Sequence, residues 1–192
     1  MLASLTLCLT NASAEIASER GVIPNMNETY SQPELRTQCK RKLETLELWL
    51  RRLIDQTLSN HYGDYFDHTD AKGNRLLSKN LVKDIEGRLA REPQRYSRRI
   101  DAVLLDDAIS IICNPNLYCH FRAALEQAFP EGCSEARTFL CRLLDPRNKL
   151  AHANPISSHD AERVFCYSSD VVSSISEYYR DCLLYTSDAA DE

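Results

Sequence analysis

The segment that most constrains the fold is a long amphipathic stretch over residues 33–60. Its aliphatic side chains recur at three- and four-residue spacing, at Leu43, Leu46, Leu50, Leu53 and Ile54. This spacing aligns them along one side of an α-helix. Charged residues fall between them, at Arg41, Lys42, Glu44, Arg51 and Arg52. The pattern predicts one long helix with a solvated charged face and an apolar face that other helices must cover.

The remainder of the chain also has helical periodicity, interrupted by turn residues. Further helices are predicted over 81–90, 100–113, 117–129, 134–144 and 157–179. Gly63 and Gly73 interrupt the period, so residues 61–80 are predicted to form a loop or a short hairpin. Only 5 of the 192 residues are glycine, which argues against a strand-and-turn architecture. We predict an all-α fold, an antiparallel bundle of four to six helices.

The two ends differ in composition from the middle. Residues 1–14 combine an apolar run with a small-residue end, as a secretory signal does, but no Lys or Arg precedes the run. Met26 offers a conventional start, so residues 1–25 are expected to be a leader or upstream translation outside the core. Residues 182–192, CLLYTSDAADE, resemble the translated end of a sequencing adapter. The expected helical domain is therefore 26–181.

Charge and cysteine usage narrow the function classes. The net charge is −5 for the whole chain, and residues 26–181 hold 22 basic and 23 acidic residues. This balance does not by itself indicate a nucleic-acid binder, although a local basic patch can still hold phosphates. The six cysteines of that interval form no CxxC pair, and no histidine completes a zinc spacing, so no structural metal and no cofactor is predicted. They are expected to be buried or free thiols.

No apolar run reaches the roughly 18 residues that cross a bilayer. We therefore expect no membrane partner and a cytoplasmic location.

The segment RNKLAH, residues 147–152, combines two chemically useful side chains. Cleaving RNA without a metal requires a group that moves protons near neutral pH and a cation that stabilises charge on phosphate. His152 and Arg147 are of these types. On an ideal helix they point about 140 degrees apart, whereas Asn148 and His152 share a face. A purely structural alternative is that Arg147 pairs with Asp145 or Glu135 and His152 caps the helix or lies in the core.

The helix boundaries around this segment can also be predicted. Asp145 and Pro146 precede it as an N-cap and a first helical residue, so it either begins a new short helix or follows a kink in one continuous helix. Pro155 should end it. Ser157 and Asp160 have the spacing of a capping box at the start of the last helix.

Arg147, the polar Asn148 and His152, set in an all-helical chain, resemble the signature of the HEPN superfamily (higher eukaryotes and prokaryotes nucleotide-binding), in its prokaryotic defence-associated branch. The resemblance is clearest over about 133–179, and Pro146 departs from the family pattern. It implies a metal-independent endoribonuclease with Arg147, Asn148 and His152 as catalytic residues. It also implies a homodimer that joins two motifs in one cleft, a toxin or phage-defence role, and an antitoxin or other defence protein as partner.

Further basic residues are candidates for binding RNA. Lys149 lies inside the motif, and Arg95, Arg98 and Arg99 cluster beside Tyr96, a composition suited to phosphates and base stacking. The alternative for the cluster is a solvated connection. Two other functions stay open: a catalytically inactive HEPN module that binds a nucleotide or a protein, and a plain helical dimerisation domain.

Overall fold

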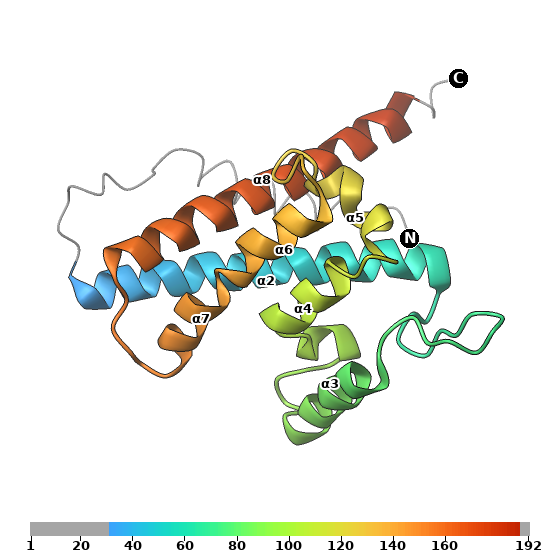
Figure 1. The fold of residues 1–192 in the computed structure, drawn as a ribbon, viewed down its shortest axis with the longest axis horizontal. Helices are drawn as coiled ribbons and strands as arrows, with labels where there is room; N and C mark the ends of the chain where they lie inside the picture. The colour runs from blue at the N-terminus through green and yellow to red at the C-terminus, as the bar shows by residue number, and fades with distance from the viewer. Residues whose placement is uncertain (1–30, 189–192) are drawn as a thin grey trace. The chain divides into compact units, whose positions relative to one another are not determined.

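A computed structural model describes residues 31–188, with side chains as far as residue 182. The predicted leader, residues 1–25, lies outside this range. Besides a short 3₁₀ helix, η1 (Arg99–Ala102), the regular elements are α2 (Gln32–Tyr62), α3 (Lys79–Arg91), α4 (Leu105–Ile112), α5 (Tyr118–Leu125), α6 (Cys133–Cys141), α7 (Leu144–Ala151) and α8 (Ser158–Asp188) (Figure 1). The prediction of an all-α helical bundle is confirmed.

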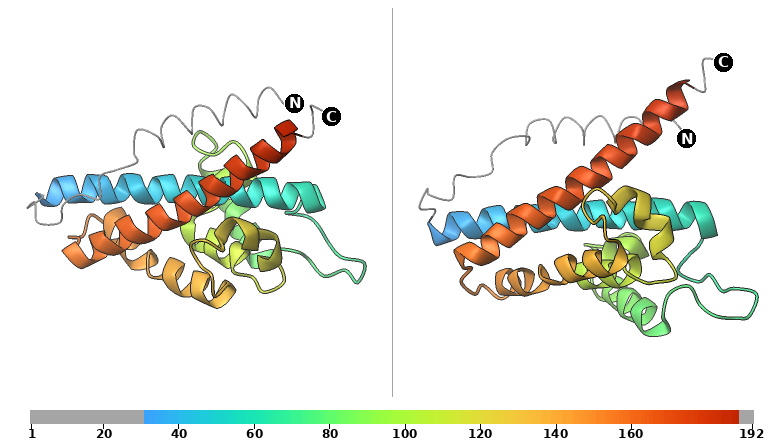
Figure 2. Two further views of the ribbon diagram at one scale, coloured as in Figure 1. Left: turned by 90° about the horizontal axis from the view of Figure 1, so that it is seen from above. Right: turned by 45° about the horizontal axis from the view of Figure 1, so that its top comes forward.

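The two long helices, α2 and α8, pack against each other, and most of the shorter helices pack against one or both of them (Figures 1 and 2). The side-chain amide of Gln32, at the start of α2, donates to the carbonyl of Ile156, just before α8, at 3.1 Å. Trp49 and Tyr179, further along each helix, also lie together, with ring centroids 6.2 Å apart. The two helices therefore run in the same direction, because α3–α7 return the chain to the start of α2. For this pair the predicted antiparallel arrangement is wrong.

The apolar face of α2 is the centre of the core. The five aliphatic residues of its sequence pattern are buried, as are Leu58 and Phe121, the latter on α5. The predicted solvated face is only partly correct. Arg51 is half-buried, and its Nε donates to the carbonyl of Val103 at 2.6 Å. Arg52 lies over the rings of Trp49 and Tyr179, at 5.6 and 5.4 Å from their centroids, so both arginines pack against neighbours rather than only facing water.

The interruptions between helices follow the turn residues. Residues 63–78 form a loop with one antiparallel bridge, between Thr69 and Arg75, and Gly73 in its turn has φ of 81°. This confirms the predicted loop or short hairpin. The helix predicted over 100–113 is wrong in one respect, because it is split into η1 and α4. The carboxylate of Asp107 accepts the N–H of Leu104 at 3.0 Å and so starts α4 afresh.

α8 continues beyond the predicted boundary at residue 181 and ends at Asp188. Among the helices of residues 31–188, none combines the length and apolar character needed to cross a membrane.

Candidate functional site

The motif forms its own short helix, α7, which carries Arg147, Asn148 and Lys149 and ends at His152. Of the two predicted alternatives, a new short helix is therefore confirmed. The predicted N-cap is wrong: Leu143 occupies that position, and Asp145 lies inside the first turn. Pro146 is also in the first turn, where a missing N–H breaks no hydrogen bond, so the helix is unbroken.

Lys149 links α7 to the start of α8. Its Nζ lies 2.7 Å from the carboxylate of Asp145 and 2.9 Å from that of Asp160. These hydrogen bonds, the one to Asp145 first, raise the pKa of Lys149. The predicted RNA contact of Lys149 would therefore compete with two carboxylates, and in this structure the side chain holds α7 against α8.

Asp160 completes the capping box predicted for α8. The Ser157 hydroxyl accepts the N–H of Asp160 at 3.1 Å, and the Asp160 carboxylate accepts the N–H of Ser157 at 3.3 Å. The Ser157 hydroxyl also donates to this carboxylate, at 2.7 Å. Burial raises the pKa of Asp160, but the hydrogen bonds from Lys149 and Ser157 outweigh it, and the net pKa is lowered.

We expect Asp160→Asn to destabilise the fold at neutral pH by about 1 kcal/mol, because the neutral amide keeps an oxygen for the Ser157 N–H but loses the charge that Lys149 and the Ser157 hydroxyl contact. The pKa of Asp160 in the folded protein lies below its ordinary value of 3.8. The ionised carboxylate therefore contributes its full stabilisation of the fold above pH 3.8. This stabilisation is lost as the pH falls through the lower, folded pKa. Urea unfolding of the parent and of Asp160→Asn between pH 7 and pH 3 measures the difference in their free energies of unfolding. This difference should shrink only at the acid end.

Glu162→Gln is the matched control, since Glu162 lies two residues further along α8 and is exposed, with His159 3.7 Å away. It should leave stability nearly unchanged. A loss for Asp160→Asn that is equal at all pH values would refute the electrostatic account.

The C-terminal end of α7 is held by α2. The guanidinium of Arg36 donates to the carbonyl of Asn154 and, at 3.3 Å, to that of Leu150. Ala153 then reverses the chain with φ of 59°. His152 is the last residue before this reversal, and its N–H donates to the carbonyl of Asn148 at 3.1 Å. Its side chain is exposed and has no hydrogen-bond partner among the side chains described, those of residues 31–182.

Arg147 faces α2. Its Nε lies 3.8 Å from Oε1 of Glu47, and its Nη1 donates to the side-chain oxygen of Asn148 at 3.3 Å. The other Glu47 oxygen accepts from Arg51 at 3.0 Å. Burial raises the pKa of Glu47, while Arg51 and Arg147 oppose that shift. The guanidinium of Arg147 thus forms a long ion pair with a mostly buried carboxylate, and neither Asp145 nor Glu135 is its partner.

Glu47 and Arg51 are the residues of this site that sequence reasoning missed. Their spacing of four is that of a helical ion pair, which was a visible signal. Only the packing of α7 on α2 gives that pair a role beside Arg147.

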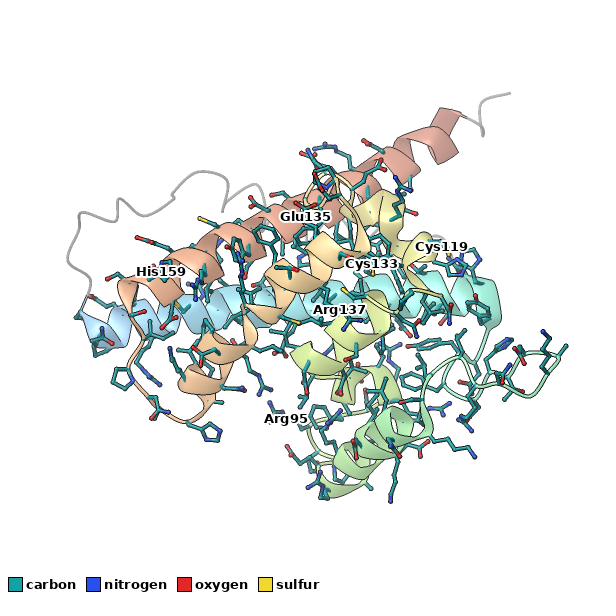
Figure 3. The ribbon with its side chains drawn as sticks, viewed as in Figure 1. Arg95, Cys119, Cys133, Glu135, Arg137 and His159 are labelled. Atoms are coloured by element: carbon teal, nitrogen blue, oxygen red, sulfur yellow. The ribbon has the colours of Figure 1, made fainter. Side chains whose placement is uncertain are left out.

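The three arginines predicted to bind RNA lie elsewhere: Arg95 and Arg98 are in the segment between α3 and η1, and Arg99 is the first residue of η1. In Figure 1 α3 and α7 lie apart with α4 between them, and Figure 3 shows Arg95 beside α3. Arg95 pairs with Glu92 at 3.3 Å. The partners of Arg98 are Asp55 and Asp101, and those of Arg99 are Asp64, Asp67 and Glu86. The structure therefore does not bring this cluster together with α7, and a phosphate would have to displace carboxylates.

No group of three or more His, Cys, Asp or Glu side chains within residues 31–188 is arranged to hold a metal ion. No protein-family model, curated protein or solved structure matches this chain.

Proposed function

We propose that this chain is a metal-independent endoribonuclease of the HEPN type. One observation supports the proposal most: a guanidinium paired with a carboxylate and an exposed imidazole belong to the same short helix and its C-cap. Arg147 pairs with Glu47, while His152 is exposed at the C-terminal end of the helix. A cation held in place for phosphate and a histidine reachable by solvent are the two groups that metal-free RNA cleavage requires.

The proposed reaction is internal transesterification. The ribose 2′-hydroxyl loses a proton and attacks the adjacent phosphorus, the bond to the 5′-oxygen breaks, and that oxygen takes up a proton. The products are a 2′,3′-cyclic phosphate and a 5′-hydroxyl. His152 is the proposed acid or base. Arg147 stabilises the charge on phosphate, and Asn148, exposed and four residues from His152, contacts the substrate on the same face.

A second copy of the chain completes this site in the proposal. Arg147, in the middle of α7, is directed at α2, whereas His152 is the C-cap of α7. One helix therefore presents the two groups in different directions. A symmetric homodimer would set the His152 of one copy near the Arg147 of the other. The cytoplasmic toxin or phage-defence role and an antitoxin partner come from the family resemblance alone.

The test is cleavage of a defined RNA by the purified full chain in excess chelator. We expect cleavage with cyclic-phosphate ends, and none of the same RNA carrying a 2′-deoxyribose at the scissile position. Sedimentation in parallel should find a dimer. Intact RNA, or cleavage that needs a divalent ion, would refute the proposal.

Arg147→Ala should slow this cleavage by about 10² to 10³, by analogy with the loss of one donor that stabilises a developing charge. Arg142→Ala is the matched control, because it removes the same charge. Arg142 is exposed, precedes α7 and lies over the Phe139 ring. Single-turnover rates of the two variants distinguish the loss of the phosphate-stabilising group from the loss of one positive charge. An equal decrease in both would mean that only the overall charge matters.

A catalytically inactive module that binds a nucleotide or a protein is the second candidate. It is favoured by the ion pairs of Lys149, Arg95, Arg98 and Arg99, all of which have carboxylate partners. Nucleotide binding without RNA cleavage in the assay above would favour it.

A further inference from the structure

Two cysteines distant in sequence meet where α4 ends and α6 begins. Cys113 is the C-cap of α4, and Cys133 is the first residue of α6. The Cys133 thiol donates to the carbonyl oxygen of Cys113 at 3.4 Å, which sets the two cysteines side by side. Arg137, one turn further along α6, donates to the same carbonyl at 2.6 Å (Figure 3). Two side chains of α6 therefore bind the same backbone carbonyl at the end of α4.

The two thiols differ in access. Cys113 is fully buried, whereas Cys133 is partly exposed. Burial, followed by the neighbouring Cys133, raises the pKa of Cys113 to about 12. Because the thiolate is the nucleophile in disulfide exchange, Cys113 cannot react first at neutral pH. An external oxidant would meet Cys133 first.

We infer that Cys113 and Cys133 form an oxidisable pair, a modification site that reacts with small-molecule disulfides such as oxidised glutathione. The Cys133 thiolate attacks one sulfur of the reagent, whose disulfide bond breaks and releases one thiolate. Cys113 then loses its proton to solvent and attacks the Cys133 sulfur, which releases the second glutathione thiol. Two electrons pass from the protein to the reagent, and the new bond joins α4 to α6.

The test uses the full chain incubated with oxidised glutathione, followed by alkylation and peptide mapping by mass spectrometry. The parent should gain a bond between Cys113 and Cys133. Cys113→Ser should stop at a glutathione adduct on Cys133, while Cys133→Ser should form neither. As long as the pH stays below the pKa of Cys113, the disulfide should form about ten times faster for each unit that the pH rises, because the thiolate fraction of Cys113 rises by the same factor. The thermal midpoint should rise on oxidation, since a cross-link restricts the unfolded chain.

Cys119→Ser is the matched control, because Cys119 is exposed on α5. This substitution should leave the reaction unchanged. A bond from Cys133 to Cys141, or a Cys133 that stays fully alkylatable, would overturn the inference. None of these measurements involves RNA, so they stand apart from the proposed nuclease activity.

Discussion

His152→Ala should lower the rate of RNA cleavage by about 10² to 10⁴, the usual contribution of a general acid or base. The loss should appear in the single-turnover rate, because the proposed role is proton transfer rather than binding. The fold should be unaffected, since the side chain is exposed and its hydrogen bonds within residues 31–188 come from the backbone alone. Cleavage rates and thermal unfolding of the same preparation measure both expectations.

His159→Ala is the matched control. His159 is also an exposed histidine, at the start of α8, and its ring nitrogen lies 3.7 Å from Glu162 (Figure 3). It should retain the parent rate. If His152→Ala cleaves as fast as His159→Ala, the nuclease assignment fails, and if it unfolds, His152 has a structural role instead.

The parts of the fold that could be predicted are those fixed by local pattern. α2 follows from aliphatic spacing, and the start of α8 follows from Ser157 and Asp160, whose mutual hydrogen bonds are as the capping box requires. The split before α4 was not predictable in this way. Residues 100–113 are apolar enough for one helix, and the break depends on Asp107, whose carboxylate takes the Leu104 N–H.

The candidate site shows the same division. The sequence placed Arg147 and His152 in one helical segment, either a new short helix or the part of a longer helix after a kink, but the partner of Arg147 is Glu47, far away along the chain. Likewise, Arg99 is neutralised by Asp64 and Asp67 from a loop whose course the local pattern leaves open. A sequence pattern thus identifies charged residues, whereas their pairing depends on which helices pack together.

Arg88 provides the clearest case of such a long-range pair. Its guanidinium donates to the carboxylate of Asp107 and, through Nε at 2.9 Å, to the carbonyl of Ala102. The two side chains are only 17% and 10% exposed. Burial raises the pKa of Asp107, and the Leu104 N–H and Arg88 oppose that shift. Arg88 therefore compensates a buried charge and joins α3 to the start of α4.

Arg88→Ala should destabilise the fold by about 3 to 5 kcal/mol, because it leaves a buried carboxylate without its partner. This is a large part of the roughly 5 to 15 kcal/mol that stabilise a typical domain. Since the pKa of Asp107 is raised, lowering the pH should protonate the orphaned carboxyl and reduce the loss. Urea unfolding at pH 7 and near pH 4 measures the change.

The double variant Arg88→Ala with Asp107→Asn tests the cause. The side-chain amide introduced by Asp107→Asn would keep an oxygen for the Leu104 N–H but carry no charge, so much of the lost stability should return. Arg91→Ala, which removes an exposed arginine from the same helix, should change stability by no more than about 0.5 kcal/mol. If the double variant is as unstable as Arg88→Ala alone, the loss comes from packing or from the Ala102 contact rather than from the unpaired charge.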